Sequence, residues 1–163
     1  MNIVANCRNN ENETMNNLTI YKDGFCISTH KAKLDLEAVH QFLSTQSYWS
    51  LHIPFEKVAK AAANSLCFGL YFNEQQIGYA RIISDYSTFA YLADVYVLPE
   101  FRGRNLSKWL MQTIMAHPEL QGLRRWLLLT KDAHGLYKQY GWQTIAHPEK
   151  CMEIHHQDVY KST

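Results

Sequence analysis

The sequence lacks three features that would point to particular classes of protein. Its 163 residues carry a formal net charge of only +1, so no basic field favours binding to nucleic acid. No apolar run is long enough to span a bilayer. The opening stretch, MNIVANCRNNENETMNN, has neither the basic start nor the apolar core of a secretory signal. We therefore expect no nucleic-acid partner, no membrane attachment and a cytoplasmic location.

The cysteines lack the spacing of the common metal sites. None of the four cysteines forms a CxxC pair, and none has zinc-finger spacing with a histidine. The eight histidines are scattered along the chain. We therefore expect free thiols in a reducing compartment and no metal in the chemistry.

The composition changes once, near the beginning of the chain. Residues 1–17 are rich in Asn and poor in periodic apolar positions, which predicts a disordered arm. Neither an internal repeat nor a Gly/Ser linker divides residues 18–163, and a hydrophobic fraction of 47% over the whole chain is enough for a core. We therefore expect a single domain over residues 18–163.

The spacing of apolar residues predicts strands and helices in alternation. We expect a strand over residues 24–32, helices over 36–46 and 53–65, and a hairpin over 65–72 and 77–84. A strand over 91–98, a helix over 106–117, a strand over 124–130 and a helix over 132–141 follow. The last expected element is a hairpin over 142–146 and 150–156. Asp35 is placed to cap the first helix, and Pro54 to begin the second. The order β-α-α-β-β-β-α-β-α-β-β, with a parallel crossover from Tyr91 to Thr130, predicts an α/β fold with helices on both faces of a mixed sheet.

The turn after Pro99 has the features of an anion site. A helix N-terminus exposes unpaired backbone N–H groups with a partial positive charge. Gly103 tolerates the backbone angles of a tight turn, and Arg102, Arg104 and Lys108 surround it with positive charge. These residues predict a cradle for a diphosphate, with a solvated surface loop as the alternative interpretation.

Three stretches of the sequence resemble the GCN5-related N-acetyltransferase (GNAT) superfamily. VYVLPEFRGRNLSKWL resembles its acetyl-CoA-binding motif, with Arg102 in the Arg/Gln place, while Asn105 and Ser107 stand where the pattern has Gly and Gly/Ala. DAHGLYKQYGW resembles its late helix and SLCFGLYFNEQQIGYARII its central hairpin, so that the likeness covers roughly residues 25–145. Because Asn tolerates a left-handed conformation and Ser is small, we expect the loop to keep its shape.

The resemblance implies direct transfer of an acetyl group from acetyl-CoA to a primary amine of a small molecule or peptide. It also implies a splayed central strand pair that opens a slot for the cofactor. We expect a monomer or a homodimer. The cofactor-binding positions that it implies are Val95, Tyr96, Val97, Arg102, Gly103, Arg104, Asn105, Leu106, Ser107, Lys108, Thr130 and Ala133. A non-catalytic acyl-CoA-binding regulatory module of the same fold is the alternative.

Two residues are candidates for the proton transfers that such a reaction needs. Tyr137, in the Leu-Tyr pair of the late helix, is the expected general acid, since a phenol pKa of about 10 exceeds a thiol pKa of about 8.5. Asp94 is an unexpected acid within the apolar run YLADVYV. It is a candidate base or substrate contact, and pairing with Arg81 is the alternative.

The acceptor is expected near the first two helices and the central hairpin. The stretch QSYWSLHIPFEKV brings Tyr48, Trp49, His52 and Phe55 to this region. Such an aromatic wall can stack a ring or hold an ammonium group, or it can simply join the helices to the sheet. The substrate contacts that we expect are Trp49, Arg81 and Tyr91.

Overall fold

The computed structural model describes residues 17–161, and the predicted disordered arm lies almost wholly outside this range. The centre of the molecule is a six-stranded sheet in which the strands follow one another in chain order. All neighbouring strands are antiparallel except the last pair, which is parallel. The strands are β1 (Thr19–Lys22), β2 (Phe25–Ser28), β3 (Leu66–Phe72), β4 (Gln75–Ser84), β5 (Phe89–Val97) and β6 (Arg125–Leu127).

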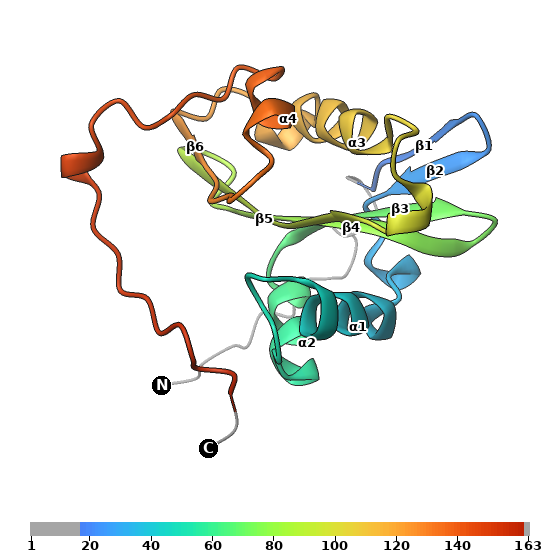
Figure 1. Cartoon of the computed structure of the whole chain (residues 1–163). Helices are drawn as coiled ribbons and strands as arrows, with labels where there is room; N and C mark the ends of the chain where they lie inside the picture. The colour runs from blue at the N-terminus through green and yellow to red at the C-terminus, as the bar shows by residue number, and fades with distance from the viewer. Residues whose placement is uncertain (1–16, 162–163) are drawn as a thin grey trace, which may run out of the picture.

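Helices cover both faces of this sheet (Figure 1). On one face lie α1 (Leu36–Gln46) and α2 (Phe55–Ala63), and on the other lie α3 (Leu106–Met115) and α4 (His134–Lys138). Short 3-10 turns occur at Lys31–Lys33, Pro99–Phe101, Pro118–Leu120 and Pro148–Lys150. The α/β fold with a mixed sheet and a parallel step from β5 to β6 is therefore confirmed.

The face under α1 and α2 carries a core of its own. α1 begins where expected, because the Asp35 carboxylate accepts a hydrogen bond from the Ala38 N–H at 2.9 Å. One side of each helix packs on the sheet, where Phe42 stacks on Tyr96 with 3.8 Å between the ring centroids. This stack fixes α1 against the second half of β5, which is the half that carries the expected cofactor contacts.

The opposite face is covered mainly by α3. Its apolar side is fully buried at Leu110, Met111 and Ile114 and packs against β-strand residues such as Phe68 and Ile82. Helical spacing of these residues explains why the helix was predictable from the sequence. Because α3 packs on this face, the turn that joins β5 to α3 must lead from the end of β5 towards this face.

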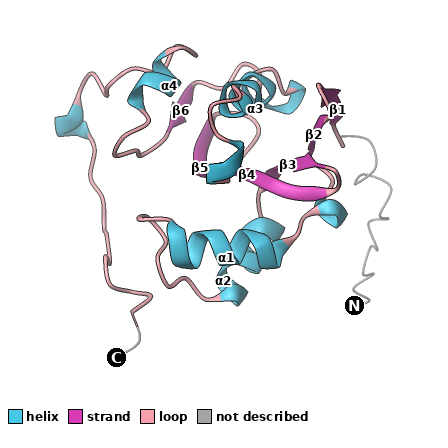
Figure 2. Ribbon diagram, turned by 45° about the vertical axis from the view of Figure 1, so that its right-hand side comes forward, coloured by secondary structure: helices cyan, strands magenta, loops and turns pink. Residues whose placement is uncertain are grey.

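Both ends of the sheet differ from the expected pattern. The first strand is a β1–β2 hairpin, because Asp23 and Gly24, both at positive φ, reverse the chain between them. The predicted final hairpin does not form: from the end of α4 to residue 161 the chain is loop apart from one short helical turn (Figure 2). Met152 and Ile154 are 99% and 90% exposed. Alternating apolar residues do not make a strand where no neighbouring strand covers them.

Candidate active site

The parallel strands β5 and β6 pair along only a short length. Their register joins Phe89–Tyr91 to Arg125–Leu127, and β5 continues to Val97 without β6 beside it. The expected splayed strand pair is therefore present. It leaves one edge of β5 open over the residues that the sequence assigned to the cofactor.

A β-bulge in β5 lies where the strands separate. Tyr79 pairs with Tyr96, whereas Arg81 pairs with Ala93, so β5 has one more residue than β4 between these two pairs. Asp94 adopts a left-handed conformation there, at φ 55°. Because a bulge bends its strand and increases its twist, this residue redirects the second half of β5.

The open edge of β5 presents backbone donors to the slot. The Leu98 N–H donates to the Ile77 carbonyl at 2.8 Å, on the side of β4. Because successive residues of a strand direct their N–H groups to opposite edges, those of Val97 and Val95 point away from β4. These are the positions from which the sequence resemblance expected contacts to a thioester arm.

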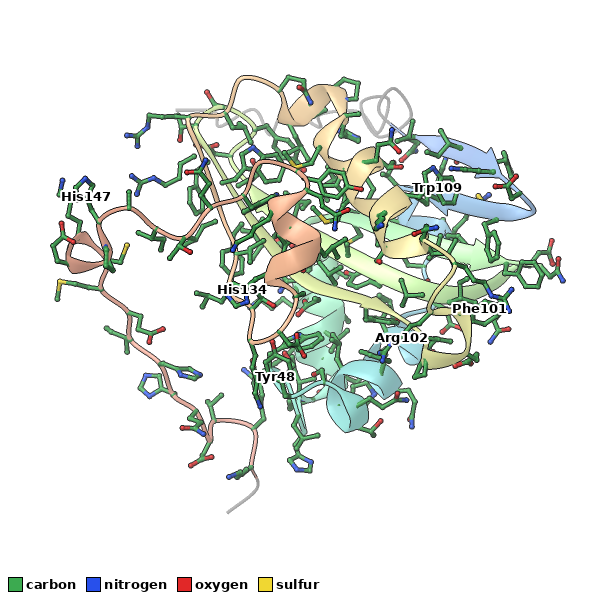
Figure 3. The ribbon with its side chains drawn as sticks, turned by 45° about the horizontal axis from the view of Figure 1, so that its top comes forward. Tyr48, Phe101, Arg102, Trp109, His134 and His147 are labelled. Atoms are coloured by element: carbon green, nitrogen blue, oxygen red, sulfur yellow. The ribbon has the colours of Figure 1, made fainter. Side chains whose placement is uncertain are left out.

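The turn between β5 and α3 has the shape expected of it. Gly103 has φ 77°, and a Cβ built there would meet no heavy atom within 4 Å. Asn105, which precedes the first residue of α3, is left-handed at φ 60° and ψ 16°, as its substitution for Gly predicted. The Arg102 Nε donates to the Val97 carbonyl at 3.0 Å and so ties the turn to the strand end. Figure 3 shows Phe101 and Arg102 together in this turn.

Two adjoining cavities meet beside the bulge. One, of about 430 Å³, extends along the open half of β5 to the N-terminus of α3. It brings together nine of the predicted cofactor positions, namely Val95, Tyr96, Val97, Arg102, Gly103, Asn105, Leu106, Ser107 and Ala133. Arg104, Lys108 and Thr130 lie outside its wall; Arg104 instead stacks on Phe101, and Thr130 accepts a hydrogen bond from the Ala133 N–H at 3.1 Å.

The second cavity, of about 650 Å³, lies on the other side of the bulge. It brings together the predicted substrate contacts Trp49, Arg81 and Tyr91 with Asp94. Tyr48, Trp49, Val95 and Tyr137 line both cavities. These four residues therefore mark the junction at which a group in one cavity could reach a group in the other.

Tyr137 is the candidate acid at this junction. Its side chain comes from α4, is only 8% exposed and has no hydrogen-bond partner within residues 17–161. Burial raises the pKa of Tyr137 to about 12. The hydroxyl is therefore protonated at neutral pH and free to donate.

Asp94 faces the second cavity with both carboxylate oxygens engaged. One oxygen accepts from the Arg81 Nε at 2.7 Å, and the other accepts from the indole Nε1 of Trp49 at 3.2 Å. Arg81 also donates to the Ser65 hydroxyl at 3.2 Å. The pairing of Asp94 with Arg81, which the sequence left as an alternative, is the arrangement found.

Some contributions to the site could not be read from the sequence. The Tyr48 hydroxyl accepts from the Lys131 N–H at 2.8 Å and so joins the loop after α1 to the chain after β6. Figure 3 shows Tyr48 between the start of α4 and the helices α1 and α2. His155 and Gln157 of the C-terminal segment line the second cavity. The only sequence signal for any of these was the aromatic character of the stretch around Tyr48.

Comparison with known proteins decides the family. The family model described as "Acetyltransferase (GNAT) family" matches residues 36–142. The chain belongs to the GNAT acetyltransferase family. A Gibberella zeae protein named as a putative acetyltransferase is 33% identical over an alignment of 135 residues, and the match covers 69% of this chain and 75% of that protein.

Solved structures agree with the GNAT assignment. A Xanthomonas campestris structure described as a putative GNAT-family acetyltransferase is 48% identical with a TM-score of 0.83, and the match covers 85% of this chain and 97% of that one. A GNAT acetyltransferase of Elizabethkingia anophelis, solved with acetyl-CoA bound, shares the fold at 15% identity and a TM-score of 0.55, over 73% of this chain and 76% of that one. The chain is thus an acetyltransferase by family, and GNAT relatives of its fold bind acetyl-CoA.

Two features are absent from the described part of this GNAT chain. No helix in residues 17–161 is long and apolar enough to cross a membrane. No group of three or more His, Cys, Asp or Glu side chains in the same residues is placed to hold a metal ion.

Proposed function

We propose that this chain transfers an acetyl group from acetyl-CoA to a primary amine of a small molecule or peptide. The observation that carries the proposal is the junction of the two cavities, where Tyr137, whose hydroxyl is protonated at neutral pH, lines both. A donor in one cavity and an acceptor in the other would meet beside this hydroxyl. Acetyl-CoA supplies the activated acetyl thioester, and the Elizabethkingia relative is the precedent for its binding.

The first cavity fits such a donor. The open space at Gly103 lets a phosphate approach the unpaired N–H groups at the start of α3, a helix of ten residues. The unpaired edge of β5 would hold an extended arm through the N–H groups of Val95 and Val97. We therefore place the diphosphate end at the turn and the acetyl end at the bulge.

Tyr137 is the proposed general acid. A thiol leaving group needs a proton or a hydrogen bond, and a hydroxyl without a partner can supply either. Its raised pKa keeps that proton in place throughout the neutral range. A positioned acid of this kind contributes about 10²–10⁴-fold to a rate.

The second cavity is the proposed acceptor site. Aromatic walls at Trp49 and Tyr91 would pack on the acceptor, and the Arg81–Asp94 pair would contact it with polar atoms. A primary amine must lose a proton before it attacks, because its pKa of about 10 keeps it charged at neutral pH. Since both Asp94 oxygens are engaged, we propose that this proton leaves through water in the cavity.

The test has two arms. Titration calorimetry with acetyl-CoA measures binding, and thiol release over a panel of primary amines (amino acids, arylamines, polyamines and short peptides) measures transfer. We expect binding, turnover of at least one amine, and a 10²–10⁴-fold loss of kcat in Tyr137→Phe without loss of acetyl-CoA binding.

Tyr140→Phe is the matched control. Tyr140 follows α4, donates its hydroxyl to the Lys108 carbonyl at 2.6 Å and lines neither cavity, so the same change of side chain is expected to leave kcat unchanged. Binding of acetyl-CoA without turnover of any amine would instead favour the non-catalytic acyl-CoA-binding module. Equal activity of Tyr137→Phe and wild type would remove Tyr137 from the chemistry.

A further inference from the structure

The Asp94 carboxylate connects three parts of the chain that are far apart in sequence. It accepts hydrogen bonds from Trp49, in the loop between α1 and α2, and from Arg81, on β4. Arg81 in turn donates to Ser65, just before β3. The Asp94 and Arg81 side chains are only 11% and 15% exposed. This network therefore joins the helical layer to the bulge from within the acceptor cavity.

Trp49 depends on this connection for its position. Trp49 is 41% exposed, so packing restrains it only in part. Its indole N–H donates to Asp94, and its ring meets the Tyr48 ring edge-to-face with 5.0 Å between centroids. The Tyr48 hydroxyl in turn accepts a hydrogen bond from the Lys131 N–H, in the segment that follows β6. The Tyr48–Trp49 pair thus bridges the separation between β5 and β6.

This bridge lies at the junction of the two cavities. Tyr48 and Trp49 line both cavities, together with Tyr137 and Val95. A change in the indole position would alter the boundary between donor and acceptor. Small displacements of reacting groups are costly, because a near-attack geometry requires the reacting atoms to lie about 3–3.5 Å apart.

We propose that Asp94 is a positioning residue that acts through Trp49. It holds the indole as the partition between the donor and acceptor cavities, and it does not take the proton of the amine. The engagement of both oxygens supports this role, because each oxygen already holds a side chain of the protein in place. The inference rests on the proposed acetyl transfer.

Asp94→Asn removes one of the two hydrogen-bond acceptors of Asp94 with little change in shape. A carboxylate offers two acceptor oxygens, whereas an amide offers one. The bond from the charged Arg81 is shorter, at 2.7 Å, than the bond from Trp49, at 3.2 Å, so we expect the variant to keep Arg81 and release Trp49. Asn also tolerates the left-handed conformation that Asp94 adopts, so the bulge itself is preserved. Trp49→Phe removes the indole N–H and keeps an aromatic ring. Trp109→Phe, on α3, makes the same replacement for an indole that lines neither cavity.

The experiment measures kcat and KM as functions of pH, with an amine that the wild-type protein acetylates. Indole N–H resonances of ¹⁵N-tryptophan-labelled protein are recorded in parallel and report both folding and the Trp49 hydrogen bond. We expect a loss of about tenfold in kcat for Asp94→Asn and a similar loss for Trp49→Phe. The double variant should lose about tenfold as well, not about a hundredfold, since both changes break one interaction.

Three further results are expected. The shape of the pH profile stays that of the wild type, KM for acetyl-CoA changes by less than about threefold, and Trp109→Phe behaves as wild type. The Trp49 indole resonance moves in Asp94→Asn while the other indole resonances stay in place. If Asp94→Asn does not fold, Trp49→Phe alone must show the loss.

Several outcomes overturn the inference. One is a Trp49→Phe protein that stays active while Asp94→Asn is inactive, and another is a double variant whose losses in kcat multiply. The inference also fails if Asp94→Asn removes one limb of the pH profile of kcat, or if the Trp49 indole resonance does not move in Asp94→Asn. Each would assign Asp94 a role independent of Trp49. Failure of the proposed function is a different result, since the wild-type protein would then acetylate no amine.

Discussion

Asn105 allows the backbone requirement of the cofactor turn to be measured. This residue is left-handed at φ 60° and ψ 16°, and its side chain makes no capping hydrogen bond to α3. The side chain therefore contributes nothing to the cap, and the conformational preference of the residue is what the position selects. Replacement by Gly, Ala or Val changes that preference in steps.

The expected magnitudes follow from the cost of a left-handed backbone. For residues other than Gly, Asn and Asp this conformation costs about 1–2 kcal/mol. We expect Asn105→Gly to stay within about 0.5 kcal/mol of the wild type, because the freedom of Gly in the unfolded chain offsets its better fit. Asn105→Ala should lose about 1 kcal/mol, and Asn105→Val about 2 kcal/mol because β-branching narrows its allowed angles further.

The cost can appear in either of two measurements. If the turn keeps its shape, the free energy of unfolding falls and the Kd for acetyl-CoA is unchanged. If the turn relaxes, stability is kept and the Kd rises, about fivefold for a cost of 1 kcal/mol. Urea unfolding measures the loss in free energy of unfolding, and calorimetry measures the loss in free energy of acetyl-CoA binding. The sum of the two is compared between variants.

Ser107→Ala is the control, because Ser107 lies within α3 and has no special backbone requirement. Its unfolding free energy should stay within about 0.5 kcal/mol of the wild type. The reasoning would be refuted by an Asn105→Ala protein that matches both the stability and the acetyl-CoA affinity of Asn105→Gly.

Three other predictions follow from buried positions. Gly78→Ala should cost about 1–3 kcal/mol and weaken acetyl-CoA binding, since a Cβ there would lie 2.8 Å from the Tyr96 carbonyl oxygen; urea unfolding and calorimetry check this. Burial lowers the pKa of His117, so on acidification the histidine takes up a proton more readily in the unfolded chain than in the folded one. The free energy of unfolding therefore falls as the pH drops below about 6.5. His117→Phe should lessen that fall, as measured by urea unfolding between pH 7 and 5. Burial raises the pKa of Tyr137 to about 12, so the stability that its protonated hydroxyl contributes is complete below about pH 10 and is lost as the pH rises towards 12. The free energy of unfolding of Tyr137→Phe should therefore depend less on pH between 10 and 12.

Elements with local signals were predictable from the sequence. The helix over 36–46 has the same bounds in the structure, because the Asp35 cap and the apolar spacing both act within the segment. The left-handed residue before α3 was likewise expected, because Asn105 stands at a glycine position of the resembled motif and Asn tolerates this conformation. Both effects are local: the Asp35 carboxylate caps a backbone N–H three residues later, and Asn105 adopts its conformation through its own backbone preference.

Elements that need a distant partner were predicted less well. The sequences over 142–146 and 150–156 alternate as strands do, yet these segments have no neighbour in the sheet and remain loop. β6 is likewise shorter than the apolar run over 124–130. Strand length depends on what lies beside the segment, which alternation within the segment does not encode.

The charges in the central strands show the same limit at the site itself. Arg81 and Asp94 are visible in the sequence as odd charges, and a regular ladder continued from the Tyr79–Tyr96 pair would place them directly opposite each other. The bulge instead pairs Arg81 with Ala93 and makes Asp94 the extra residue. Asp94 still reaches the Arg81 Nε, at 2.7 Å, but its left-handed backbone also brings its second oxygen to Trp49. A sequence pattern can therefore predict the ion pair, whereas the contact that links it to the partition between the cavities exists only because the strand is irregular at this residue.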